Sequence, residues 1–177
     1  MTIKITLNPK RRGFFDERSD CMKNSSNALV LYFTLTNNTK KAANTVAAIT
    51  GADIEMLRLE EPYSNDYAEA AKRAEQEKDQ QIIPELRPLK HQLNDYETIY
   101  LGFPTWWYQP PMVIHTFFAE HQFSGQTIVP FTTSASSSIT ASAKVLASLT
   151  ERKNVDLKAG FTANQTTTIK QYFKDRL

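Results

Sequence analysis

The chain has 177 residues, which suits one domain of ordinary size. Apolar residues make up 41% of the chain and charged residues 23%, a composition that excludes an intrinsically disordered protein. The 21 basic and 19 acidic side chains nearly cancel, which argues against nucleic acid as a partner. No stretch approaches the roughly 18 consecutive apolar residues of a membrane span, and we expect a cytoplasmic protein without a membrane partner.

The charge is unevenly placed along the chain. Residues 1–26 hold six basic and three acidic side chains, which leaves 15 basic and 16 acidic ones for residues 27–177. We therefore expect a basic, poorly ordered N-terminal arm over 1–26, followed by a single near-neutral domain over 27–177. The arm carries Cys21, and because this is the only cysteine, the domain has no internal disulfide.

Strand-like runs alternate with helical spacing from residue 28 onward. In chain order the patterns predict a strand at 28–33, a helix at 40–50, a strand at 53–59, a helix at 67–78, a strand at 98–103, a helix at 112–120, a strand at 127–132, a helix at 139–149, a strand at 155–161 and a helix at 167–176. This alternation predicts an α/β fold, a doubly wound five-stranded parallel sheet in the order 2-1-3-4-5 with helices on both faces. Pro130 is unusual within the strand predicted at 127–132, because proline has no N–H to donate to a neighbouring strand in the centre of a sheet.

Three loops follow predicted strands at the edge where doubly wound sheets bind ligands. The first, TLTNNT at 34–39, joins a buried strand to a helix, so its hydroxyl and amide side chains and backbone N–H groups are suited to an anion. An ordinary capped turn is the equally simple interpretation. The loop lacks the glycines of a Walker A sequence, which argues against a nucleotide triphosphate site of that kind.

The other two loops differ in chemistry. PTWWYQPP, at 104–111, places three large aromatic residues between prolines, and at least one of them should cover a flat ligand, unless all pack under neighbouring loops. TTSASSS, at 132–138, offers small side chains and hydroxyls to the edge of a ligand, but it lacks the GxSxG sequence that surrounds the nucleophilic serine of many hydrolases. The three histidines (His91, His115 and His121) have no metal-ligand spacing, so we predict no metal site and no catalytic residue.

Several ordered segments together resemble a known family. LVLYFTLTNNTKKAANTVA resembles the first strand, phosphate loop and first helix of flavodoxin-like proteins, with their S-x-T-G-N-T pattern. YETIYLGFPTWWYQPPMVIHTFF resembles the G-[FY]-P-x-W-W-G loop of the short bacterial flavodoxin-like family, and TIVPFTTSASSSI resembles its P-F-x-T-S-G-G-S segment, which includes Pro130. PYSNDYAEAAKRAEQE is similar to the second crossover. The resemblance covers roughly residues 28–177.

The resemblance implies an FMN site and a flavodoxin-like electron-transfer flavoprotein. Its cofactor-binding residues would be Thr34, Leu35, Thr36, Asn37, Asn38 and Thr39 at the phosphate, Pro104, Thr105, Trp106, Trp107 and Tyr108 along the isoalloxazine ring, and Thr133, Ser134 and Ala135 at its other edge, with Tyr63 a weaker candidate. The expected partner is a redox protein or a small-molecule electron acceptor. The alternative function is an NAD(P)H-dependent FMN quinone reductase, a flavin oxidoreductase.

The chain departs from the family pattern at glycine positions. Asn37 replaces the glycine of the phosphate loop, Tyr108 the one after the tryptophans, and Ala135 and Ser136 the Gly-Gly pair. Asn tolerates the left-handed region, whereas Tyr and Ala would each cost about 1–2 kcal/mol there. A third hypothesis is therefore a flavodoxin fold with weakened or lost FMN binding.

Overall fold

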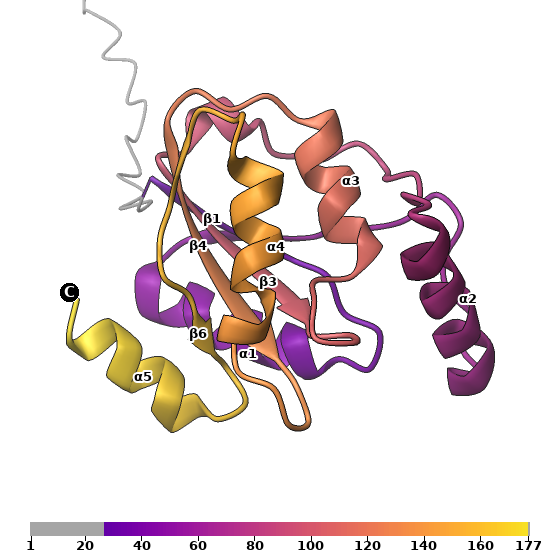
Figure 1. Cartoon of the computed structure of the whole chain (residues 1–177). Helices are drawn as coiled ribbons and strands as arrows, with labels where there is room; N and C mark the ends of the chain where they lie inside the picture. Colours follow the sequence, from indigo (N-terminus) through magenta and orange to yellow (C-terminus); the bar gives the residue numbers. More distant parts are fainter. Residues whose placement is uncertain (1–26, 177) are drawn as a thin grey trace, which may run out of the picture.

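The computed structural model describes residues 27–176, so the arm predicted for 1–26, with Cys21, lies outside the described residues. The described chain forms a parallel sheet in the order β2-β1-β3-β4-β5, with a short β6 also paired to β4 (Figure 1). The predicted fold class and strand order are confirmed. The elements are β1 (Ala28–Tyr32), α1 (Asn38–Thr50), β2 (Asp53–Met56), α2 (Tyr67–Gln80), the 3-10 helix η1 (Leu93–Asp95), β3 (Thr98–Pro104), α3 (Met112–Glu120), β4 (Gln126–Thr133), α4 (Thr140–Thr150), β5 (Val155–Leu157), β6 (Phe161–Thr162) and α5 (Thr166–Lys174).

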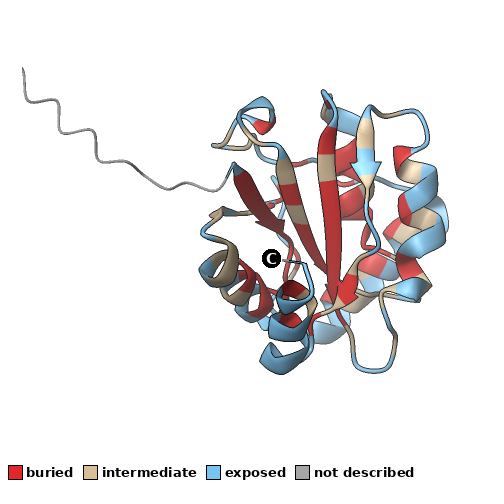
Figure 2. Ribbon diagram, turned by 90° about the vertical axis from the view of Figure 1, so that its left-hand side faces the viewer, coloured by how far each residue is buried: buried red, intermediate tan, exposed pale blue. Residues whose placement is uncertain are grey.

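Helices cover both faces of the sheet. Helices α1 and α5 pack on the face to which Val30 and Tyr32 of β1 belong, and α2, α3 and α4 pack on the face of Leu29 and Leu31. Figure 2 shows buried strands between helices whose outer surfaces are exposed. Because successive strand residues point to opposite faces, one continuous apolar run contributes to two hydrophobic cores.

The helices are amphipathic and short. The longest, α2, has 14 residues and contributes Ala70 and Ala74 to the hydrophobic core, while most of its charged side chains are exposed. Among residues 27–176, no helix has both the length and the apolar character to cross a bilayer.

The strand predicted at 53–59 is shorter than expected. It ends at Met56, because its partner β1 ends at the paired residue Tyr32, and the N–H of Leu57 makes the last bond, to the Tyr32 carbonyl at 2.8 Å. Leu57 and Leu59 are nevertheless buried. The alternation of apolar residues therefore indicated burial correctly beyond the end of the strand.

The strand predicted at 155–161 was wrong as a single element, since β5 and β6 are separated by a break opposite Pro130. On that side of β4, the carbonyls of Ile128 and Thr132 accept bonds of 2.9 and 2.7 Å from the edge segment. The backbone N–H and C=O groups of every second residue point to the same side of a strand. Pro130, which has no N–H, therefore faces the same edge segment as Ile128 and Thr132. Gly160 lies against it, and a Cβ there would be 2.1 Å from the Pro130 carbonyl oxygen. The break thus accommodates the proline.

Glu55 ties the end of β2 to the segment after α2. Its carboxylate accepts bonds from the backbone N–H groups of Lys90 (2.8 Å) and His91 (3.1 Å) and contacts Nδ1 of His91 at 2.7 Å. Burial alone would raise the pKa of Glu55, but these bonds and the nearby imidazole outweigh burial and hold the pKa below its ordinary value. The ionised carboxylate therefore stabilises the folded state.

Candidate functional site

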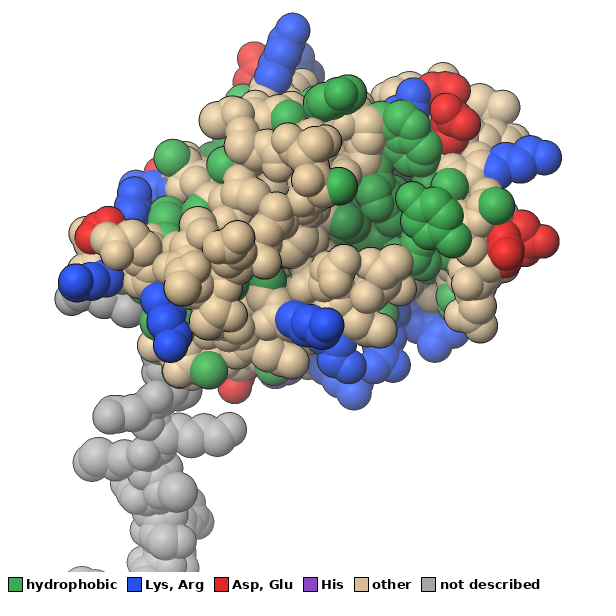
Figure 3. All heavy atoms as spheres, turned by 90° about the horizontal axis from the view of Figure 1, so that it is seen from below, with side chains coloured by type: hydrophobic (Ala, Val, Ile, Leu, Met, Phe, Trp, Pro, Cys, Tyr) green, Lys and Arg blue, Asp and Glu red, His purple; other side chains and the backbone are tan. Residues whose placement is uncertain are grey.

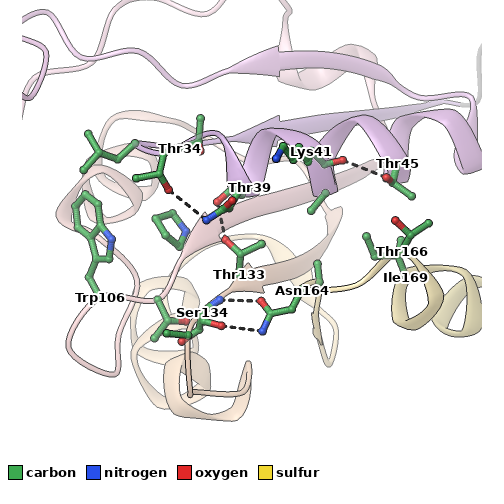
Figure 4. A pocket seen from close by; sticks show the side chains of 18 of the residues that line it. Thr34, Thr39, Lys41, Thr45, Trp106, Thr133, Ser134, Asn164, Thr166 and Ile169 are labelled. Atoms are coloured by element: carbon green, nitrogen blue, oxygen red, sulfur yellow. Dashed lines mark hydrogen bonds between the residues drawn. The ribbon is translucent and has the colours of Figure 1, made fainter. Parts of the chain in front are cut away.

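Four loops at the carboxyl ends of the strands surround a cleft of about 660 Å³. Three are the loops predicted from the sequence, after β1, β3 and β4. The fourth follows β6. The cleft is lined by Thr34, Leu35, Thr36, Asn38, Thr39, Lys41, Ala42, Thr45, Tyr67, Pro104, Thr105, Trp106, Thr133, Ser134, Ala135, Ala163, Asn164, Thr166 and Ile169 (Figure 4).

The loop between β1 and α1 presents unpaired backbone donors. Asn37 precedes the helix with φ 64°, a left-handed conformation that asparagine tolerates, and its side chain makes no capping bond. The backbone N–H groups from Thr36 to Lys40 find no acceptor among the described residues. The first turn of α1 contains no acidic residue. Such an end attracts an anion through its free N–H groups and the helix dipole.

Threonine side chains join the loops. The Thr39 and Thr133 hydroxyls lie 2.8 Å apart, linking α1 to the end of β4, and those of Thr105 and Thr132 lie 2.7 Å apart, linking β4 to the loop after β3. The Thr105 N–H also donates to the Thr133 carbonyl at 2.9 Å. Thr39 is almost fully buried, so its hydroxyl braces the loops. Its backbone N–H is one of the free donors described above.

Asn164, in the loop after β6, holds the loop after β4 in place. Its Oδ1 accepts from the Ser134 N–H at 2.9 Å, and its Nδ2 donates to the Ser134 carbonyl at 2.7 Å. Ser134 Oγ in turn accepts from the N–H of Ser137 at 3.0 Å. Ala135 and Ser136 are not among the residues with positive φ, so losing the family's Gly-Gly pair causes no backbone strain here.

The far end of the cleft lies between α1 and α5. Lys41 and Thr45 of α1 face Thr166 and Ile169 of α5 (Figure 4). Lys41 is the only charged side chain among the lining residues, and no acidic side chain lines the cleft. Its electrostatics therefore favour an anionic ligand.

Trp106 forms the opposite wall. Its ring packs edge-on against Phe33 and Tyr63, each with a centroid distance of 5.6 Å. Two mutual hydrogen bonds of 3.0 Å between the backbones of Trp106 and Gln109 close a tight turn. Its central residues, Trp107 and Tyr108, have φ of 45° and 64° and are exposed. Positive φ at both central positions matches a type I′ turn, which prefers Asn-Gly.

Tyr63, whose ring contacts Trp106, belongs to a buried hydrogen-bonded network. The Tyr63 hydroxyl donates to Glu77, whose carboxylate also accepts from Arg73 Nε at 2.8 Å. Arg73 donates further to the carbonyls of Glu61 (3.0 Å) and Pro62 (3.1 Å). Burial, followed by the bond to Glu77, raises the pKa of Tyr63. Tyr63, a weaker sequence candidate, thus lies behind the wall of the cleft, not in its lining.

Most of the predicted site residues line the cleft, and three do not: Asn37, Trp107 and Tyr108. The sequence reasoning missed Lys41, which lies one turn inside α1, and it missed the loop around Asn164. The predicted topology could have identified that loop, because it follows the last strand at the same edge of the sheet. Among the described residues no group of three or more His, Cys, Asp or Glu gathers in a metal-binding arrangement.

Comparisons with known proteins agree with this architecture. The sequence model of the flavodoxin family matches residues 27–175. A candidate flavoprotein of Bacteroides uniformis is 32% identical with a TM-score of 0.73, covering 85% of this chain and 99% of its own. A second, of Bacteroides eggerthii, is 30% identical with a TM-score of 0.74, covering 84% and 96%.

A more distant structure shares the fold. It is a flavoprotein of Lactobacillus acidophilus in complex with FMN, 17% identical with a TM-score of 0.70, covering 82% of this chain and 97% of its own. A search of curated proteins finds no match. With the family match spanning nearly all described residues, the chain belongs to the flavodoxin family.

Proposed function

We propose that the chain binds FMN in this cleft and acts as an electron-transfer protein. The phosphate would lie at the N-terminus of α1, and the isoalloxazine ring would extend toward Trp106. Family membership and the FMN held by the Lactobacillus acidophilus flavoprotein support this assignment. When bound, FMN supplies the redox chemistry, while the protein supplies position and electrostatics.

One observation supports the proposal more than any other. The backbone N–H groups from Thr36 to Lys40 are free, and three of these residues, Thr36, Asn38 and Thr39, line the cleft, whose only charged lining side chain is Lys41. A phosphate monoester requires several donors and a positive potential, and both are present. The hydroxyls of Thr34 and Thr36 line the same end and would add side-chain donors.

The chemistry of the other end suits a flat ring. Trp106 and Pro104 provide apolar surface, while Thr133 to Ala135 provide small side chains that let the backbone approach a ring edge. The aromatic contacts of Trp106 with Phe33 and Tyr63 hold this wall in place before a ligand arrives. A preformed wall lowers the entropic cost of ordering a binding site.

Comparing FMN with riboflavin tests the phosphate site. We expect FMN to bind at least about tenfold more tightly, which corresponds to roughly 1.4 kcal/mol, because riboflavin leaves the free N–H groups without an acceptor. Lys41→Ala should weaken FMN binding about threefold to tenfold and leave riboflavin unchanged. Lys40→Ala is the matched control, since Lys40 is exposed and does not line the cleft. Equal affinities for the two flavins would contradict the assignment.

An NAD(P)H-dependent quinone reductase is the second candidate function. A small groove beside the cleft, which shares Trp106 and three further lining residues with it and has no charged side chain in its lining, favours this alternative. Steady-state NAD(P)H oxidation with menadione separates the two: rapid turnover by the pure holoprotein indicates the reductase, and its absence indicates the carrier. A colourless protein that takes up no added FMN would instead support the third hypothesis, a flavodoxin fold that has lost its cofactor.

A further inference from the structure

We propose that a groove between α2 and the aromatic loop binds a flat, uncharged aromatic molecule of the quinone class. We call it the α2 groove. It has a volume of about 270 Å³ and is lined by Leu35, Tyr67, Ala70, Ala71, Ala74, Thr105, Trp106 and Trp107. Figure 3 views the molecule from the side of the strand ends and shows hydrophobic side chains gathered in a hollow between polar surroundings.

The floor of the groove is a stripe of small side chains on α2. Ala70, Ala71 and Ala74 follow Tyr67 at the spacing that places residues on one side of a helix. Ala70 and Ala74 are buried, so the floor is continuous with the hydrophobic core. Alanine side chains project little, and a stripe of them forms a flat apolar surface.

The opposite wall is formed by the only two tryptophans in the protein. The rings of Trp106 and Trp107 lie 6.4 Å apart at an interplanar angle of 77°. Trp107 is 41% exposed, and Lys78 Nζ lies 5.8 Å from the centre of its ring. Such a cation–π contact helps to hold an otherwise exposed ring in place. Trp106 also borders the cofactor cleft, so ligands in the two sites would share this side chain.

The lining of the groove restricts what can bind there. No charged side chain lines it, and Lys78, which contacts Trp107, is paired with Asp79, so a phosphate-bearing molecule such as a nicotinamide dinucleotide has no unpaired cation to bind its charges. The volume lies just below the roughly 300–1,000 Å³ of drug-sized pockets, which suits a molecule of one or two rings. Tyr67 lines the groove and is 72% exposed, so its hydroxyl is available to donate to a carbonyl oxygen.

The position of the groove suggests a role for its occupant, and this step depends on the FMN site proposed above. Reduction of a quinone to a hydroquinone consumes two electrons and two protons, which the reduced cofactor can supply as it returns to the oxidised form, and a nicotinamide could then reduce it again. The two ligands would lie against a shared wall, because four of the residues that line the groove also line the cleft: Leu35, Tyr67, Thr105 and Trp106. The groove would thus hold the small-molecule electron acceptor.

The two tryptophan indole N–H signals in a nitrogen–proton NMR spectrum provide a direct binding assay, with 1,4-naphthoquinone as the probe. We expect naphthoquinone to shift both signals, because both rings line the groove. FMN should shift mainly the Trp106 signal, because only this tryptophan lines the cleft. A Trp107 signal that does not move with naphthoquinone would overturn the proposal.

A matched pair of variants tests the location. Ala71→Leu fills the groove with a good helix former and should weaken naphthoquinone binding at least tenfold, while FMN affinity stays the same because Ala71 does not line the cleft. Ala68→Leu is the control, since Ala68 is exposed on the same helix and outside the groove. Unchanged naphthoquinone affinity in Ala71→Leu would refute the assignment. Should that variant fail to fold, Trp107→Ala must give the same loss, and unchanged binding there would be equally decisive.

The two proposals fail in different ways. If FMN does not bind but naphthoquinone still shifts both indole signals, the FMN site is wrong and the α2 groove stands as a binding site. If FMN binds and naphthoquinone leaves Trp107 unmoved, the groove is wrong and the cofactor site stands.

Discussion

Replacing Tyr108 by glycine should stabilise the protein, although it removes a large side chain. Tyr108 has φ of 64° and is 74% exposed, so its side chain buries little surface that glycine would lose. An L-residue in the left-handed region costs about 1–2 kcal/mol. Glycine avoids this cost but loses about 0.5–1 kcal/mol in the unfolded chain, where it has more conformations. The net gain should be about 0.5–1 kcal/mol.

Tyr108→Ala is the matched comparison for this prediction. Alanine also removes the aromatic ring, but its Cβ keeps the backbone strain, so the difference between the glycine and alanine variants reports the backbone alone. We expect the glycine variant to melt about 1–4 °C above the wild type, since 1 kcal/mol corresponds to about 2–4 °C in a domain of this size. The melts should be recorded without flavin, because ligand binding would raise the stability of each variant by a different amount.

The outcome also bears on the role of the strained turn. A glycine variant no more stable than the alanine variant would refute the argument that positive φ at Tyr108 is costly. If the glycine variant is more stable but binds FMN less tightly, the strain contributes to holding the aromatic wall in its binding geometry. Higher stability with unchanged FMN affinity would mean that the strain is confined to the turn.

Three further predictions follow from the site and its supports. Trp106→Ala should weaken FMN binding by about 1–3 kcal/mol, the range for aromatic stacking on a flat ring. Trp107→Ala should change the FMN affinity little in a fluorescence titration, because Trp107 does not line the cleft. Equal losses in the two variants would mean that Trp107 also contacts the flavin. Tyr63→Phe leaves the buried Glu77 without one donor and should destabilise the protein by about 1–2 kcal/mol in urea unfolding, and an unchanged midpoint would show that the bond contributes nothing. Glu55→Gln should lower stability at neutral pH. Because the pKa of Glu55 is lowered in the folded state, the stabilisation by its carboxylate is complete above about pH 4.5 and is lost as the pH falls through the folded-state pKa. The stability difference from the wild type should therefore shrink below about pH 4.5, and a difference that stays constant with pH would contradict this explanation.

The backbone architecture was predictable because each strand and helix carries its own pattern. The run at 28–33 and the helix at 112–120 needed no tertiary information, and they match the structure within one residue. The break between β5 and β6 depends on the contact of Gly160 with Pro130, which lies thirty residues away in the chain, so no local pattern could indicate it. Pro130 itself was the only feature of the sequence that indicated an irregularity in this part of the sheet.

The candidate site was predictable where one loop forms it and less so where loops meet. The donors before α1 follow from a strand, a polar turn and a helix in succession. Lys41 and Asn164 were missed for different reasons: the first belongs to a helix face that turns toward the cleft, and the second contributes through bonds to Ser134 on another loop. Among the aromatic residues, the sequence could not distinguish Trp106 from Trp107, because the turn that separates them depends on bonds from Trp106 to Gln109.

The interrupted strand at the end of the sheet also affects how this protein behaves toward other chains. A long, regular edge strand offers a row of free backbone groups to which another molecule can add a strand, and this is a common start of aggregation. Here the edge consists of pieces of three and two residues, and Asp156 and Lys158, which pair at 2.6 Å, place charges beside it. The break opposite Pro130 therefore leaves no continuous edge strand to which another chain could add. Pro130 weakens the hydrogen bonding of β4 to the edge of the sheet, and the resulting break protects the protein from pairing with other chains.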